Sequence, residues 1–201
     1  MTRLLLVRHG QTPSNVKHIL DSAPPGPSLT ALGREQADLL AERTAEDPIS
    51  AVYASVATRA QETATPMARR RNLGVTVLGG IHEVQAGDLE GRNDPEALAA
   101  FVEVYRGWTE GALHVAMPGG ETGAAILERF TADIDHLRES HPDELVAVVS
   151  HGGLMRLGAE VLADNVGPQL ANAGLIPNTG HILLESTGRG WHCLEWTGVR
   201  L

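Results

Sequence analysis

Leu4-Leu5-Leu6-Val7-Arg8-His9-Gly10 decides the fold, together with its later counterpart, Leu145-Val146-Ala147-Val148-Val149-Ser150-His151-Gly152. Each stretch opens with a short, continuous apolar run, which is typical of a strand buried on both faces of a parallel sheet. Such sheets bind their ligands beyond the carboxyl ends of the strands. We therefore expect His9 and His151 to face one another across a single site. Because Arg8 adjoins the first histidine, the expected ligand is an anion, and a phosphate fits best.

The composition of the 201 residues, 42% hydrophobic and 20% charged, is that of an ordinary globular protein. We expect one domain over residues 1–201, with a loop or cap insertion around residues 79–120. There is no bilayer-length apolar stretch and no signal-peptide pattern, so the expected location is cytoplasmic, without membrane contact. The net charge of −9 argues against a nucleic-acid partner. Cys193, the single cysteine, lies in an apolar-aromatic stretch and is expected to be a core residue.

Short apolar runs alternate with helical patterns along most of the chain. The predicted strands are residues 3–8, 50–54, 74–78, 145–150, 180–186 and 191–197, and the predicted helices are residues 30–46, 57–72, 95–106, 121–140 and 153–164. This alternation indicates an α/β fold, a three-layer α/β/α arrangement whose mostly parallel sheet has helices on both faces. Residues 10–29 and 79–120 do not fit the pattern. We expect both to be functional loops over the carboxyl edge of the sheet, although a plain surface loop stays open for the second.

Several motifs occur in an order that resembles the histidine phosphatase superfamily, the phosphoglycerate mutase-like proteins. The resemblance covers nearly the whole chain, and one position departs from it: Glu62 stands where the family has glutamine, a change that we expect to matter little. The matching segments are Arg8-His9-Gly10-Gln11-Thr12 with Asn15, Leu29–Ala37, Ser55–Ala64, Glu83 with Gly87 and Glu90-Gly91, Pro118–Thr122, and Val149–Gly153.

The resemblance implies a metal-independent phosphomonoesterase that works through a phosphohistidine. His9 is the implied nucleophile, and it needs an unprotonated ring nitrogen while a backbone carbonyl holds the proton on the other nitrogen. Arg8 and Arg59 are implied to clamp the phosphoryl oxygens and to neutralise their charge. We expect no cofactor and no metal, because two arginines and a protonated histidine supply the positive charge.

Further residues are assigned to the phosphate by the same resemblance. His151 is implied to bind the phosphoryl group as a charged donor, helped by the Asn15 amide and the Gly152 N–H. Gln11 and Thr12 adjoin the pocket and are expected to support the His9 loop. Asn178-Thr179 resembles a family position near the site, but a simple turn explains this pair equally well.

Glu83 is the implied general acid for the leaving group. We expect its pKa to be raised by burial or by the negative charge of the phosphate, so that it stays protonated near neutral pH. Two plainer interpretations stay open, in which Arg59 pairs with Glu62 and Glu83 is a solvated loop carboxylate. Glu121 is equally explained as a helix-capping residue, and His82 is the one other histidine near a motif.

Hydrolysis of a small phosphorylated metabolite is the favoured function, with a phosphoglycerate mutase as the alternative. The well-known mutases are longer between the glutamate and the second histidine, whereas here that interval is short and carries few positive charges. These charges are Arg92, Arg106, Arg129 and Arg138.

Other classes of function are weaker. A non-catalytic phospholigand-binding module is expected to lose the nucleophile or the acid, and this chain retains both. A metallohydrolase is disfavoured because no histidines or carboxylates have ligand spacing. Sugar phosphates, phosphoglycerate derivatives, nucleotides and cofactor intermediates stay open as substrates, and so does a homodimer.

Overall fold

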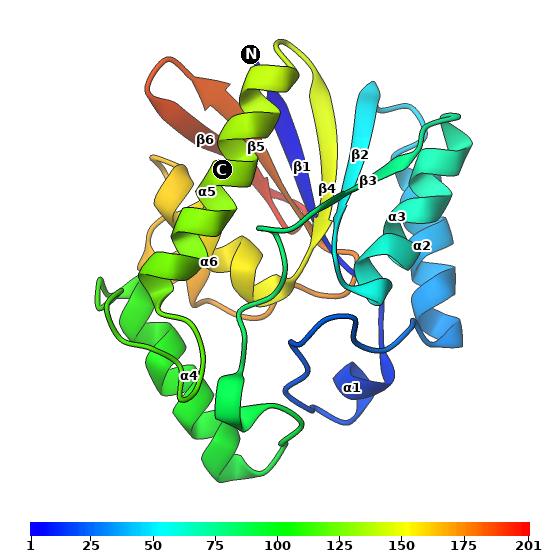
Figure 1. Cartoon of the computed structure of the whole chain (residues 1–201). Helices are drawn as coiled ribbons and strands as arrows, with labels where there is room; N and C mark the ends of the chain where they lie inside the picture. Colours follow the sequence, from blue (N-terminus) through cyan, green and yellow to red (C-terminus); the bar gives the residue numbers. More distant parts are fainter.

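A sheet of seven strands lies at the centre of the computed structural model, which describes residues 1–201 (Figure 1). In sheet order the strands are β3 (Val75–Leu78), β2 (Ile49–Ser55), β4 (Leu145–Ser150), β1 (Arg3–Arg8), β5 (His181–Thr187), β6 (Gly190–Trp196) and β7 (Val199–Arg200). The pairs among β1 to β4 are parallel, and the pairs that involve β5, β6 or β7 are antiparallel. Only Gly188 and Arg189 separate β5 from β6, and strands joined so tightly must run antiparallel.

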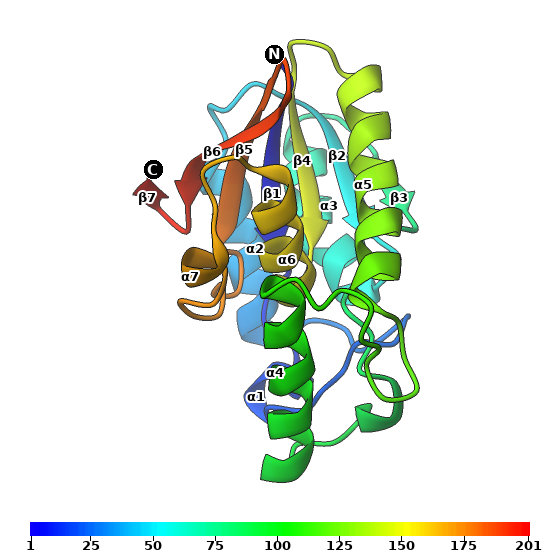
Figure 2. The same ribbon diagram turned by 90° about the vertical axis from the view of Figure 1, so that its left-hand side faces the viewer.

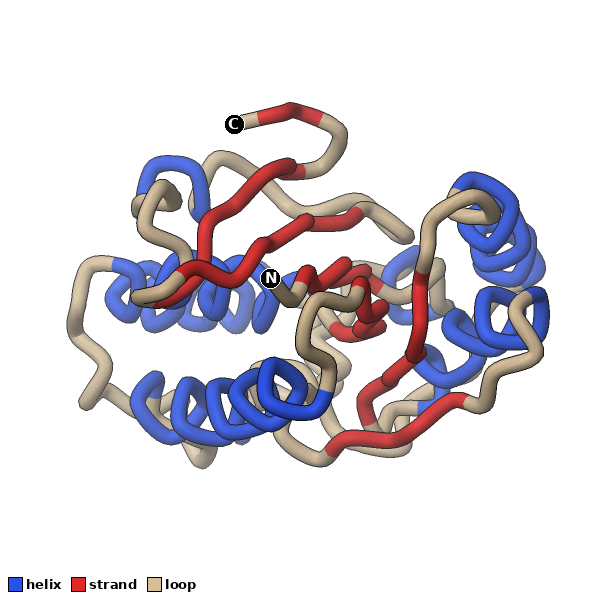
Figure 3. Tube along the Cα trace, turned by 90° about the horizontal axis from the view of Figure 1, so that it is seen from above, coloured by secondary structure: helices blue, strands red, loops and turns tan.

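Helices cover both faces of this sheet, which confirms the predicted α/β class (Figure 3). They are α1 (Pro13–Val16), α2 (Ala31–Arg43), α3 (Thr58–Arg70), the 3₁₀ helix η1 (Gly87–Leu89), α4 (Pro95–Thr109), α5 (Gly123–Ser140), α6 (Gly152–Leu162) and α7 (Pro168–Ala171). All of the predicted helices and strands are present, with ends that differ by a few residues. Sequence reasoning missed α1, η1, α7 and β7, which are too short to show a hydrophobic period.

The two faces of the sheet build two separate cores, and β1 contributes to both. Leu4 and Leu6 pack with residues of α4, α5 and α6, whereas Leu5 and Val7 pack with residues of α2 and α3. Alternate side chains of a strand point to opposite faces, so a strand buried on both sides must be apolar throughout. Cys193 is fully buried in the first of these cores, as predicted.

Strand register brings the two motif histidines to the same level. Arg8 at the end of β1 pairs with Ser150 at the end of β4, so His9 and His151 each take the next step out of the sheet. On the other side of β4, Ala54 pairs with Val149, which leaves Ser55 level with the same edge. The polar residues that end three adjacent parallel strands therefore lie close together at the carboxyl edge of the sheet.

The two irregular segments lie over this carboxyl edge, as predicted. In Figures 1 and 2, α1, η1 and α4 gather beyond the ends of β1 and β4, opposite the N-terminus. Residues 10–29 are not entirely a loop, because Thr12 caps α1 by accepting a hydrogen bond from the Asn15 N–H. None of the helices combines the length and the apolar character that crossing a bilayer requires.

Candidate active site

His9 follows β1 and is held in one tautomer by its neighbours. Its Nδ1 lies 2.7 Å from the Gly10 carbonyl oxygen, which can only accept, so Nδ1 carries the proton. Its Nε2 accepts a hydrogen bond of 3.2 Å from the Arg59 Nε–H. Burial, followed by the charges of Arg59 and Arg8, lowers the pKa of His9 well below the usual value. The imidazole is therefore neutral, with its lone pair on Nε2, as the predicted backbone carbonyl contact requires.

Arg59 enters the site from the first turn of α3 and is only 2% exposed. Its NH2 donates to the Asp21 carbonyl at 3.1 Å, and its NH1 lies 3.8 Å from an Asp21 carboxylate oxygen. Arg59 does not pair with Glu62, which instead accepts from the Leu29 N–H at 2.7 Å. Gly26 has a φ of +64°, and a Cβ there would clash with the Arg59 guanidinium. Glycine at this turn thus lets the arginine pass under the loop.

His151 lies behind His9, with the two ring centroids 5.2 Å apart. It is fully buried, and its Nε2 lies 2.7 Å from the Ser55 hydroxyl oxygen. Burial and the nearby His9 and Arg59 lower its pKa well below the usual value. The predicted charged donor is therefore neutral in this structure, because burial above all, and then the nearby positive charge of Arg59, disfavours the protonated imidazole. An anion between these groups would oppose that shift.

Three buried polar atoms around His9 have no hydrogen-bond partner. They are Arg8 Nε, Arg59 NH1 and His151 Nδ1, and the one other such atom in the protein belongs to Glu160. An unsatisfied buried polar group costs about 1–3 kcal/mol, so such groups are rare and call for an explanation. Their clustering at the end of β1 and β4 is what an anion-binding site requires.

An asparagine pair fixes the loop that follows His9. Asn178 donates from its amide both to the His9 carbonyl at 3.0 Å and to Asn15 Oδ1 at 3.1 Å. The Thr12 N–H also donates to Asn15 Oδ1, at 3.1 Å, so the Asn15 amide nitrogen is left to donate to a ligand. Asn178 thus does more than form a turn. Gln11 was predicted to support the His9 loop, and its side chain does so by contacting α2. The Gln11 side-chain oxygen accepts a hydrogen bond from the hydroxyl of Thr30, which precedes the first residue of that helix.

Glu83 reaches the site from the segment between β3 and η1. Its carboxylate accepts from the N–H groups of Gly153 at 3.1 Å, Leu154 at 2.9 Å and Val84 at 2.9 Å. A Cβ at Gly153 would lie 2.8 Å from Glu83 Oε1, so the glycine makes room for this contact. Glu83 is thus not a solvated loop residue. The three N–H donors fix the position of the Glu83 carboxylate beside the first turn of α6.

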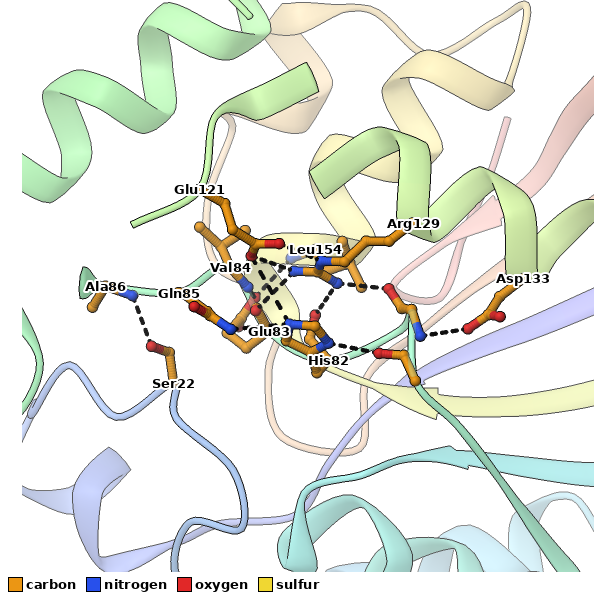
Figure 4. Close-up of polar contacts among 12 residues, drawn as sticks. Ser22, His82, Glu83, Val84, Gln85, Ala86, Glu121, Arg129, Asp133 and Leu154 are labelled. Atoms are coloured by element: carbon orange, nitrogen blue, oxygen red, sulfur yellow. Dashed lines mark hydrogen bonds and ion pairs between the residues drawn. The ribbon is translucent and has the colours of Figure 1, made fainter. Parts of the chain in front are cut away.

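A partly buried arginine of α5 holds the Glu83 segment in place (Figure 4). Arg129 donates to the carbonyls of Gly80 at 2.6 Å, His82 at 2.8 Å and Glu83 at 3.1 Å. Glu121 binds the same guanidinium through two hydrogen bonds of 2.9 and 3.1 Å. Glu121 is therefore the counterion of this clamp and not a helix cap, because Thr122 caps α5. Sequence reasoning had no signal for the clamp, since its carbonyl acceptors carry no residue identity.

A pocket of about 800 Å³ opens in front of His9. Arg8, Arg59, Asn15 and Glu83 line its inner end, together with Gly152 at the first residue of α6. The outer wall is largely apolar and comes from α4 and the segment after α7. It consists of Leu98, Phe101, Val102, Tyr105, Leu175 and Ile176. His151 stays behind the pocket surface, and no cluster of three or more metal-ligating side chains occurs in the protein.

Comparisons with known proteins agree with this geometry. Residues 4–198 match the family model of the histidine phosphatase superfamily, branch 1. Phosphoserine phosphatase 1 of Hydrogenobacter thermophilus is 31% identical, over 78% of this chain and 74% of that protein. The PE-PGRS family protein PE_PGRS11 of Mycobacterium tuberculosis is 31% identical over 96% of this chain, which spans only 36% of that protein's length.

A solved structure supports the same assignment. The mycobacterial glucosyl-3-phosphoglycerate phosphatase, solved with VO3, superposes with a TM-score of 0.84 at 26% identity. The superposition covers 98% of this chain and 99% of the other. The family match spans nearly the whole chain, and its motif histidines lie at one edge of the sheet. The protein belongs to the histidine phosphatase superfamily, branch 1.

Proposed function

We propose that the protein is a phosphomonoesterase that hydrolyses a small phosphorylated metabolite through a phosphohistidine on His9. The observation that carries the proposal is a set of buried nitrogens without a hydrogen-bond partner, on Arg8, Arg59 and His151, around a neutral His9. A phosphoryl group placed there would accept hydrogen bonds from all three residues, with the Asn15 amide and the Gly152 N–H beside them. The phosphatase names and the vanadium ligand among the relatives support the same chemistry.

The proposed reaction has two steps. His9 Nε2 attacks phosphorus, the bond from phosphorus to the ester oxygen breaks, and Glu83 donates a proton to the departing oxygen. Water then attacks the phosphorus of the phosphohistidine and gives one proton to Glu83. The bond from phosphorus to His9 Nε2 breaks, which frees the imidazole and releases inorganic phosphate. When the substrate binds, the Arg59 Nε–H stops donating to His9 and donates to a phosphoryl oxygen instead. The lone pair on His9 Nε2 is then free to attack phosphorus. We propose that binding of the dianionic ester favours the protonated form of Glu83 by charge repulsion, with the proton taken up from solvent.

Hydrolysis is preferred over a mutase reaction because the interval between Glu83 and His151, which is longer in the well-known mutases, offers no spare cation to retain a released acid. The four arginines between Glu83 and His151 all have acidic partners. The pairs are Arg92–Asp94, Arg106–Glu110, Arg129–Glu121 and Arg138–Asp135. A mutase must hold a released acid for return transfer, whereas a phosphatase lets water in.

His9→Ala tests the proposal directly. With p-nitrophenyl phosphate and EDTA present, we expect kcat to fall at least about 10³-fold, because the covalent route is lost. Rapid alkaline quenching of the wild type with a ³²P-labelled ester should trap an acid-labile protein label that the variant lacks. His136→Ala, at an exposed histidine of α5, serves as the control. Near-normal turnover of the His9 variant, or loss of wild-type activity with EDTA, would overturn the mechanism.

A further inference from the structure

Arg156 is a third arginine beside the proposed phosphate site, after Arg8 and Arg59. It lies one turn into α6 and lines the pocket. Its Nε donates to the Gly152 carbonyl at 3.3 Å, and its NH1 donates to the Ala171 carbonyl at 3.1 Å. The Tyr105 ring covers one face of the guanidinium, with Cζ 4.7 Å from the ring centroid. The side chain is therefore held in one position before any ligand arrives.

This guanidinium has no acidic partner in the protein. No carboxylate forms a salt bridge with it, in contrast to the four arginines between Glu83 and His151. Glu160 lies one turn further along α6, but burial raises its pKa and one of its oxygens has no hydrogen-bond partner. Glu83, an acid that lines the same pocket, is bound to N–H groups instead. Arg156 is thus a fixed positive charge that faces the pocket unpaired.

In space, Arg156 is separated from the phosphate-binding Arg8 by a single residue, Gly152. Gly152 lies between the two groups, since its carbonyl accepts from Arg156 and its Cα side faces Arg8. The Arg8 Nε is 3.3 Å from the place that a Cβ on Gly152 would occupy. A ligand whose phosphate lies against Arg8 therefore needs only a short carbon chain to bring a second anionic group to Arg156.

We propose that Arg156 binds a carboxylate on the leaving group, so that the preferred substrates are phosphate esters of small hydroxy acids. Stacking on Tyr105 leaves the edge of the guanidinium free, where NH2 and the second N–H of NH1 can meet a planar carboxylate. This inference rests on the proposed function. It adds a selectivity that the phosphate-binding residues cannot provide, because they contact only the group common to all phosphomonoesters.

Matched substrate pairs test the proposal. O-phosphoserine differs from O-phosphoethanolamine only by its carboxylate, and 3-phosphoglycerate carries a carboxylate where glycerol 3-phosphate has a hydroxymethyl group. We expect the wild type to favour the carboxylated member of each pair in kcat/KM. In Arg156→Gln that ratio should fall about 10- to 100-fold, the range for one hydrogen bond to a charged group. Arg156→Lys, which keeps the charge, should restore part of the ratio.

A control and a binding measurement separate this proposal from the proposed function. Arg106→Gln removes another arginine at the pocket, one that is 63% exposed and lies 3.9 Å from Glu110, and it should leave the ratio unchanged. Calorimetry in the His9→Ala background gives the same comparison without turnover, as the ratio of Kd values within each pair. If the esters are hydrolysed but neither ratio responds to Arg156→Gln, the carboxylate site is wrong and the phosphatase stands. If binding shows the preference but no ester is hydrolysed, the phosphatase is wrong and the carboxylate site stands.

Discussion

At the scale of single residues, the site depends on imidazoles that are kept neutral by their surroundings. Burial and two arginines lower the pKa of His9, while the Gly10 carbonyl places the ring proton on Nδ1. The same arginines that would bind the phosphate thus also keep the nucleophile unprotonated. For His151, the Ser55 hydroxyl occupies Nε2 and leaves Nδ1 as the atom without a partner.

Glu83→Gln should separate proton donation from positioning at this scale. Gln keeps an oxygen for the N–H groups of α6 but cannot donate a carboxylic proton. We expect alkyl phosphates such as glycerol 3-phosphate to slow about 10²–10⁴-fold. Aryl phosphates should slow far less, because a phenolate leaves without help. The measurement is kcat/KM for both classes.

Asp21→Asn is the matched control for Glu83→Gln. It makes the same chemical change at a carboxylate that lines the pocket but lies beside Arg59. We expect it to slow both classes of ester by a similar factor, because it disturbs phosphate binding and not proton transfer. If Glu83→Gln also slows both classes equally, Glu83 positions other groups and donates no proton.

At the scale of elements, the site joins rigid strands to a segment that needs support. The ends of β1, β2 and β4 are fixed by register, whereas Glu83 lies on a stretch without regular structure. The three carbonyls bound by Arg129 tie that stretch to α5, and the Glu83 carboxylate ties it to α6. The acid is therefore placed by two helices from the same side of the sheet.

Arg129→Met should loosen this segment and misplace Glu83. We expect kcat on alkyl phosphates to fall about tenfold or more, since small displacements of a catalytic group cost up to about 10²-fold. Aryl phosphates should be affected less, for the reason given for Glu83→Gln. Arg138→Met is the control, because it removes an α5 arginine that pairs with Asp135 near the surface. Equal loss on both ester classes would indicate a general folding defect.

At the scale of the whole molecule, one end of the sheet carries the site and its cover. The segments 10–29 and 79–120 come from distant parts of the chain and lie beyond the ends of β1 and β4 (Figure 1). Residues of both segments line the pocket. Two buried, neutral histidines at this end also couple the protonation of the site to the stability of the fold. Their lowered pKa values mean that the unfolded chain binds protons more readily than the native protein does.

Stability should therefore fall as the pH falls. The contribution of His9 and His151 is complete above their unfolded pKa of about 6.5 and is lost as the pH drops toward their native values. The slope is at most about 1.4 kcal/mol per pH unit for each histidine. Urea unfolding between pH 5 and 8 measures it. His9→Asn combined with His151→Asn should flatten the curve, and His136→Asn should not. A curve that stays equally steep in the double variant would contradict this origin.

Local sequence alone determined the buried strands, the main helices and the identity of the residues at the strand ends. A continuous apolar run such as Leu4–Val7 is buried on both sides only when helices cover both faces of the sheet. The α/β class could therefore be predicted from such runs. Register then brought His9, His151 and Ser55 together, because parallel strands of similar length end at the same edge. Arg59 and Asn15 were found from motif order, and the structure places both beside His9.

Tertiary structure decided the contacts that involve backbone groups and partners far apart in the chain. The N–H donors around Glu83, the carbonyls around Arg129 and the neutral state of His151 all depend on burial and on neighbours that no local pattern encodes. The unpaired state of Arg156 is of the same kind, since whether a cation has a partner depends on every chain segment that packs near it. Residue type sets the chemistry that a side chain can perform. Only packing sets its protonation, its partners and the space in front of it.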